Sequence, residues 1–137
     1  MTIQDDRTEE LRKRYLANQV LTASPAQRLL MVLDQLERDL SEAQVAFTAR
    51  DIETIHTRLL HAQEILLVLR DSLAGSGWTG AEPLRSVYLF LYNRLVECNV
   101  KKDATLIPMC QEIVAKINDA NRRAVAAEAA TAGGRVA

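Results

Sequence analysis

The sequence predicts an all-α protein, an antiparallel up-down four-helix bundle with a short N-terminal apolar segment. First, apolar residues make up 48% of the 137 residues, whereas aromatic residues make up 4%, which disfavours a sheet-rich core. Second, only 5 Gly and 3 Pro interrupt the chain, so long helices are favoured. Third, apolar residues recur at alternating steps of three and four along most of the sequence.

The first predicted helix of the bundle covers about residues 25–48. Ser24 is a good N-cap, and Pro25 suits the first helical position because its missing N–H costs nothing there. Gln27 stands three residues after the cap, the spacing of a capping box. The apolar seam that follows consists of Leu29, Leu33, Leu36, Leu40, Ala43 and Phe47. On the opposite side we expect a wet face that includes Asp39.

The second predicted helix covers about residues 51–73, with Asp51 as its N-cap. Because the connection at Ala49-Arg50 is so short, this helix must run antiparallel to the first. Its seam consists of Ile52, Ile55, Leu59, Ala62, Leu66, Leu69 and Leu73. The stretch from Ile65 to Leu69 is apolar nearly all the way round, which is more than a single seam can bury.

The third and fourth predicted helices cover about residues 82–101 and 104–121. A loop with three glycines precedes the third, and Thr79 with Glu82 has the spacing of another capping box. Asp103 caps the fourth helix, whose seam we expect at Leu106, Met109, Ile113, Ile117 and Ala120. Pro108 fits an early turn if the regular helix begins near Thr105, and indicates a local irregularity if the cap is Asp103.

Outside the bundle domain, residues 15–121, we expect two tails. Residues 1–14 are a polar N-terminal tail, and residues 122–137 are Ala-rich and expected to be flexible because they offer few large apolar side chains for docking. Tyr15 to Leu21 are too apolar for a free tail, so we expect this segment to pack against another surface. The first residues do not resemble a signal peptide, and no run is long enough to cross a membrane, which predicts a cytoplasmic protein.

The sequence offers little for catalysis, metals or nucleic acid. His56 and His61 are five residues apart, which excludes the i, i+4 pair used for zinc, and the reversed order of His61 and Glu64 does not fit a di-iron bundle. Cys98 and Cys110 lack metal-site spacing and are expected to be reduced core residues. No nucleophile motif or phosphate loop is present, so we expect no enzyme activity and no cofactor. With 17 basic and 18 acidic residues, no global field attracts nucleic acid.

What remains is apolar surface beyond the needs of one core. Leu60, Leu67 and Val68 on the second helix, with Tyr88 and Tyr92 on the third, are candidates for a groove that accepts a partner's amphipathic helix. The alternative is that neighbouring helices of the bundle cover these stripes. The segment from Tyr15 to Leu21 is a candidate cover that occupies part of such a groove until a partner displaces it.

Two segments resemble the flagellin export chaperone family, FliS. One is Tyr15-x-x-Asn18-x-Val20-x-Thr22-Ala23-Ser24-Pro25, followed by Leu30-Met31 and Leu33-Asp34. The other is Arg94-Leu95-x-x-x-Asn99-x-Lys101-Lys102-Asp103, and between them Leu60-x-Ala62-Gln63-x-Ile65 is also similar. The chain departs from the family at Gln35, at Asn121 and at Val68, which replaces an acid and makes the exposed face more apolar.

The resemblance implies a cytoplasmic chaperone that binds the disordered C-terminal segment of flagellin, prevents its premature polymerisation and helps deliver it to the flagellar type III export gate. It also implies that the N-terminal segment, here Tyr15, Asn18, Val20 and Leu21, covers part of the binding surface in the free protein. We expect a monomer or weak dimer without membrane insertion. The alternative is a structural bundle that uses the same stripe for self-association.

Overall fold

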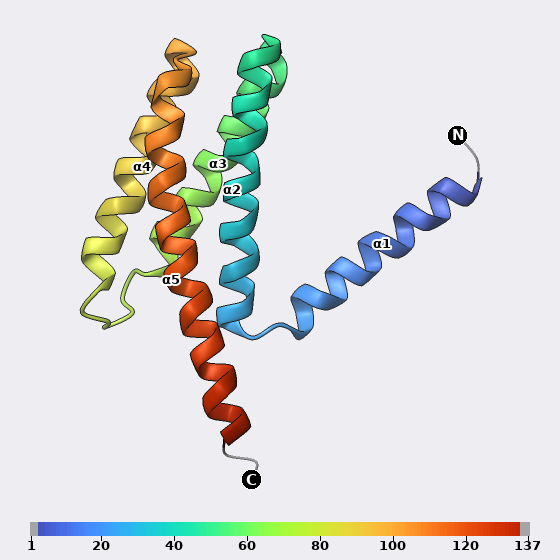
Figure 1. Ribbon diagram of the computed structural model, residues 1–137, viewed down its shortest axis with the longest axis vertical. Coiled ribbons are helices and arrows are strands. Elements are labelled where there is room, and N and C mark those ends of the chain that lie inside the picture. The colour runs from blue at the N-terminus through green and yellow to red at the C-terminus, as the bar shows by residue number, and fades with distance from the viewer. Residues whose placement is uncertain (1–2, 135–137) are drawn as a thin grey trace. The chain divides into compact units, whose positions relative to one another are not determined.

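A computed structural model describes residues 3–134 of the chain, with the side chains of residues 6–18 and 23–131. Within this range the chain forms five α-helices and one 3-10 helix and no strand, which confirms the all-α prediction (Figure 1). The elements are α1 (Ile3–Thr22), α2 (Pro25–Ala49), α3 (Ile52–Ser72), α4 (Ala81–Lys101), η1 (Ala104–Leu106) and α5 (Ile107–Gly134). None of these helices, as far as they are described, is long and apolar enough to span a membrane.

The residues Val32–Ala120 form one compact unit, and the segments before and after it form a second. Within Val32–Ala120 consecutive helices reverse direction. The turns that follow α2 and α4 lie at one end of this unit, and the longer α3–α4 loop lies at the other (Figure 1). Arg50 and Lys102 adopt left-handed backbone conformations with φ of 55° and 53°, which lets the chain turn sharply after α2 and α4.

Two of the predicted helix caps are confirmed atom by atom. At the start of α2 the Gln27 backbone N–H donates to Ser24 Oγ at 3.2 Å, and the Ser24 N–H donates to Gln27 Oε1 at 2.9 Å, which completes the capping box. At the start of α3 the Thr54 N–H donates to Asp51 Oδ1 at 3.2 Å. These bonds satisfy backbone donors that a helix start leaves unpaired.

The cap predicted at the start of α4 is wrong. Gly80 is the N-cap and makes no side-chain capping bond, so Thr79 and Glu82 form no capping box. The Trp78 ring lies against Gly80, where an added Cβ would come within 2.4 Å of it. Gly80, which has no side chain, therefore leaves room for the Trp78 ring at the helix start. Pro83 falls in the first turn of α4, where its missing N–H costs little.

The sequence left two alternatives for Pro108, an early helical turn or a local irregularity after an Asp103 cap. The structure has both features. Asp103 accepts a hydrogen bond from the Thr105 N–H at 3.0 Å and caps the 3-10 helix Ala104–Leu106. The α-helix then begins at Ile107, so Pro108 lies in its first turn. The buried side of this helix lies one position later than predicted, at Ile107, Cys110, Val114 and Asn118. Met109, which the sequence placed in the seam, is exposed.

Both ends of the chain are more helical than the sequence predicted. Residues 3–22 form one helix where we expected a polar tail followed by a short apolar segment. They contain neither Gly nor Pro, and pairs such as Arg14 with Glu10 at 3.0 Å support one another across a turn. At the other end α5 continues to Gly134 instead of ending near residue 121, since alanine has the highest helix propensity.

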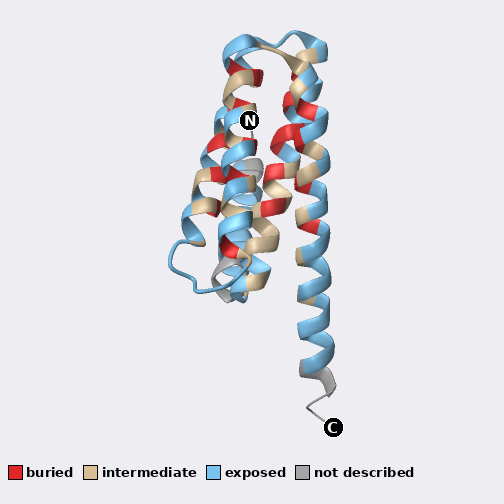
Figure 2. Cartoon of the chain, turned by 90° about the vertical axis from the view of Figure 1, so that its left-hand side faces the viewer, coloured by how far each residue is buried: buried red, intermediate tan, exposed pale blue. Residues whose placement is uncertain are grey.

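The core of Val32–Ala120 lies where its helices face one another, as the buried positions in Figure 2 show. Its largest fully buried apolar side chains are Leu33, Leu36, Leu40, Ile55, Leu59, Leu66, Leu91, Leu95, Ile107 and Val114. Six of these belong to the predicted seams of the first two bundle helices: Leu33, Leu36, Leu40, Ile55, Leu59 and Leu66. Ile52, predicted to be in the second seam, is exposed in the first turn of α3.

Asp39 corrects another expectation, because this residue of the predicted wet face is fully buried. Its carboxylate lies between α2 and α3, where His61 Nδ1 is 2.5 Å from Oδ2 and Arg58 Nη1 is 3.6 Å from Oδ1. Gln35 Nε2 also donates to Oδ1 at 3.0 Å. A buried carboxylate is tolerated when partners of this kind surround it. The α2–α3 seam thus contains a polar cluster within its apolar core.

Candidate partner-binding surface

The seam between α3 and α4 positions the candidate surface. Asn99 of α4 is nearly buried and contacts α3 twice: His56 Nδ1 lies 3.4 Å from Asn99 Oδ1, and Asn99 Nδ2 donates to Gln63 Oε1 at 3.4 Å. These contacts place the α4-facing side of α3 at His56 and Gln63. Leu60 and Leu67 lie three and four residues from Gln63, so they share this side of the helix.

On α3 the surface is apolar and open. The side chain of Leu60 is 41% exposed and that of Val68 is 64% exposed, while Leu67 is half-buried. Val68 lies eight residues after Leu60 and seven residues after His61, which turns toward Asp39 of α2. Val68 therefore sits on the α2-side flank of the stripe, away from α4. The three α3 residues of the predicted partner site are thus accessible within Val32–Ala120.

The two tyrosines of α4 that were predicted to bind a partner, Tyr88 and Tyr92, differ in burial. Tyr88 is 3% exposed, so its ring belongs to the core, and burial raises the pKa of its hydroxyl. The expectation that Tyr88 is exposed is therefore wrong. Tyr88 lies eleven residues before Asn99, so the two residues are on nearly the same side of α4, and Tyr88 faces into the α3–α4 seam. Tyr92 is half-buried and lies on the side of α4 that Asn99 turns toward α3.

Sequence reasoning missed two further apolar residues next to Tyr92. Val96 is half-buried and Leu89 is exposed, and both lie within one turn of Tyr92 on the same side of α4. The seven-residue step from Leu89 to Val96 was the available signal, since it marks a second apolar stripe beside the seam. We call the resulting surface the outer face, and define it as Leu60, Leu67, Val68, Leu89, Tyr92 and Val96.

The N-terminal residues of the predicted site belong to α1. Tyr15 and Asn18 are exposed on this helix, and Asn18 takes part in a further interaction. The side chains of Val20 and Leu21 lie outside the described residues. The role of this segment as a cover therefore remains a prediction.

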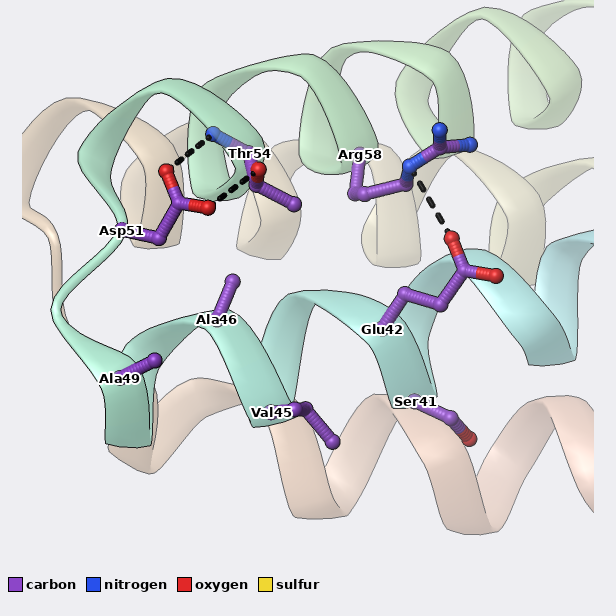
Figure 3. Close-up of a pocket in the computed structure, with 8 residues that line it drawn as sticks. All are labelled: Ser41, Glu42, Val45, Ala46, Ala49, Asp51, Thr54 and Arg58. Atoms are coloured by element: carbon purple, nitrogen blue, oxygen red, sulfur yellow. Dashed lines mark hydrogen bonds and ion pairs between the residues drawn. The ribbon is translucent and has the colours of Figure 1, made fainter. Parts of the chain in front are cut away.

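A pocket of about 430 Å³ lies between α2 and α3 near the turn that joins them (Figure 3). Val45, Ala46 and Ala49 of α2 form its apolar side. An ion pair between Arg58 Nε and Glu42 Oε2, 3.0 Å long, borders it. Asp51 is engaged in capping, and the bonds from Thr54 hold the pKa of its carboxyl below the ordinary value. These polar groups pair with one another, so the pocket presents no poised catalytic group among them.

The remaining titratable groups point to structure rather than chemistry. Burial raises the pKa of both Cys98 and Cys110 to about 11, so neither thiol is poised as a nucleophile. Among the residues described, no three His, Cys, Asp or Glu side chains are grouped so that they could hold a metal ion. His61 is engaged with Asp39, and His56 with Asn99.

Comparison with known proteins agrees with the resemblance seen in the sequence. A family model described as flagellar protein FliS matches residues 8–128. The chain belongs to the FliS family. The flagellar secretion chaperone FliS of Bacillus subtilis (strain 168) is 28% identical over 114 residues, which cover 83% of this chain and 85% of that relative. The FliS match spans the whole outer face and the α3–α4 seam beneath it.

Proposed function

We propose that this FliS-family chain is a cytoplasmic export chaperone that binds the disordered C-terminal segment of flagellin. In this role it prevents premature polymerisation and assists delivery of the subunit to the flagellar type III export apparatus. Membership of the family and the likeness to a flagellar secretion chaperone support the proposal. The structural observation that carries it is the outer face, an apolar surface that Val32–Ala120 leaves accessible.

The outer face suits a partner that folds as it binds. A disordered segment loses conformational entropy when it is ordered, so it needs extensive apolar contact for useful affinity. Leu60 and Val68 provide exposed apolar area on α3, and Leu89 extends it on α4. Two adjacent helices with apolar stripes form the kind of groove into which an amphipathic helix packs.

The proposal includes the arrangement of the chain around this surface. We propose that α2 to α5 form an antiparallel up-down four-helix bundle within a chaperone domain of residues 15–121, and that the protein is a monomer or weak dimer. Tyr15, Asn18, Val20 and Leu21 are proposed to contribute to partner binding as a displaceable cover. The loaded chaperone is then proposed to meet the export gate. No catalytic or cofactor role is assigned.

Calorimetric titration with the C-terminal segment of flagellin from the same organism tests the function. We expect a 1:1 complex, which Leu60→Asp and Val68→Asp weaken because each places a charge in an apolar interface. Val45→Asp is the matched control, since Val45 is 70% exposed on α2 and lies outside the outer face. Circular dichroism checks that all three variants keep the parent's helical content.

Absence of binding by the parent chain at micromolar concentrations would refute the chaperone proposal. Sedimentation analysis adds a second criterion: a stable dimer whose mass does not change when flagellin is added supports self-association through the same face instead. Deletion of residues 1–16 tests the cover. Higher flagellin affinity after deletion supports competition by this segment, and lower affinity indicates direct contact.

A further inference from the structure

The α3–α4 seam contains a chain of polar groups beside the apolar outer face. Gln63 and Asn99 are 7% and 8% exposed, and their side-chain amides contact each other across the seam. Lys102, just after α4, contacts Asn99, and His56 approaches it from α3. Buried amides cost stability unless their donors and acceptors are paired, so the direction of each bond matters.

Lys102 fixes that direction. Its ammonium group can only donate, and it donates to Asn99 Oδ1 and to the Asn99 backbone carbonyl at 2.7 Å. Asn99 must therefore turn its oxygen toward Lys102 and its Nδ2 toward Gln63, which accepts through Oε1. His56 Nδ1 faces the same Asn99 oxygen and acts as a donor to it as well. Both side-chain amide oxygens are thus occupied.

As a consequence, Gln63 keeps one hydrogen-bond donor, its Nε2 group, that Asn99 does not use. With Oε1 accepting from Asn99, the Nε2 group donates to no other residue in the part of the chain that the structure describes. It is not among the fully enclosed unpaired polar atoms, so it keeps some contact with solvent although Gln63 as a whole is 7% exposed. Gln63 lies between Leu60 and Leu67 on the same side of α3. A partner that covers the outer face therefore buries this N–H group, which weakens binding unless the partner supplies an acceptor.

We propose that Gln63 is a specificity-determining residue of the flagellin-binding surface, whose Nε2 donates to a backbone carbonyl of the bound segment where that segment is not helical. Carbonyls inside a helix are already paired with N–H groups of the next turn, whereas those at a helix end or in an extended stretch are free. Gln63 thereby selects a conformation of the partner backbone. This inference rests on the proposed chaperone function.

Gln63→Glu separates the outward donor from the inward acceptor. The glutamate retains an oxygen for Asn99 Nδ2, so the seam keeps its hydrogen bond, but it turns an oxygen instead of an N–H toward the partner. Gln44→Glu is the matched control, because it makes the same change at an exposed position of α2. Gln63→Met removes the donor without adding a charge, and it also removes the acceptor of Asn99 Nδ2, so its thermal unfolding is measured alongside.

We expect calorimetry to show affinity for the flagellin segment lowered at least about tenfold by Gln63→Glu, and about threefold or more by Gln63→Met. Gln44→Glu should change it less than about twofold. Alanine replacement of each polar residue of the peptide should leave the loss caused by Gln63→Glu unchanged, because the acceptor is backbone. Thermal unfolding should show Gln63→Glu still folded at the temperature of the titration, although less stable than Gln44→Glu because its charge stands at a position that is 7% exposed.

Parent-like affinity of both Gln63 variants overturns the inference while leaving the chaperone proposal intact. A peptide side chain whose removal abolishes the difference between parent and Gln63→Glu overturns the assignment to a backbone carbonyl. If the parent chain binds no flagellin segment, the proposed function fails and this inference fails with it. The parent titration therefore distinguishes the two failures.

Discussion

The polar cluster between α2 and α3 allows a quantitative test of the fold. The Asp39 carboxylate is fully buried, whereas the His61 side chain, 2.5 Å away, is 44% exposed. We predict that His61→Leu and Asp39→Leu each destabilise the protein, but that the two changes together cost much less than their sum. The reason is that a buried charge depends on its partners, whereas an apolar pair needs none.

The magnitudes follow from what each change leaves behind. His61→Leu leaves the buried carboxylate with Gln35 and Arg58 only, and loss of a hydrogen bond to a charged group costs about 1.5–3 kcal/mol. Asp39→Leu leaves His61 and Arg58, which are both partly exposed and can turn to water, so we expect about 1–2 kcal/mol. The double variant should cost about as much as Asp39→Leu alone, which corresponds to a coupling energy of about 2 kcal/mol.

Urea unfolding followed by far-UV circular dichroism measures the four free energies of unfolding in this double-mutant cycle. Gln44→Leu, at an exposed site on the same helix, controls for the effect of adding a leucine to α2. Additivity of the two changes within about 0.5 kcal/mol would mean that the pair makes no net contribution, and the reasoning would be refuted.

Three further predictions test the core and its surface. Leu59→Ala should lower the free energy of unfolding by about 2–5 kcal/mol in urea, because this side chain is fully buried and leaves a cavity. Cys98 and Cys110 should resist an aromatic disulfide reagent in the native protein and react in guanidinium. Their folded pKa values of about 11, against an ordinary 9.0, predict that the contribution of the two thiols to stability is constant below pH 9 and falls between pH 9 and 11, where only the unfolded thiols ionise. Tyr88→Asp should unfold the protein or destabilise it strongly, whereas Val68→Asp should alter its thermal unfolding little; equal effects would contradict their different burial.

Local backbone chemistry explains what the sequence predicted well. A capping box depends on residues within one turn, so Ser24 and Gln27 could be recognised from spacing alone, and the structure has both bonds. Thr79 and Glu82 have the same spacing, but there the helix begins one residue later, with Gly80 as its N-cap and the Trp78 ring lying against it. Spacing does not encode the course of the preceding loop.

Periodicity predicts a seam but does not reveal which polar residues join it. Asp39 is polar and was assigned to the solvent side, yet His61 and Arg58 reach it from another helix. The sequence makes Tyr88 a candidate for the partner surface, yet its ring is buried. Both errors arise from contacts between helices, which a count along a single helix cannot contain.

The polar residues of α3 fall into two groups: those that face α2 contribute to stability, and the one that faces α4 is proposed to contribute to partner recognition. Arg58 and His61 turn toward α2 and surround a buried carboxylate, so their hydrogen bonds are used within the folded chain. Gln63 turns toward α4, where a single bond to Asn99 leaves its second polar group unused by the described chain. Substitution on the α2 side should therefore change the free energy of unfolding, whereas Gln63→Glu on the α4 side should change partner affinity while the fold is retained. If both sides changed stability alone, the outer face would be only the exposed margin of a core.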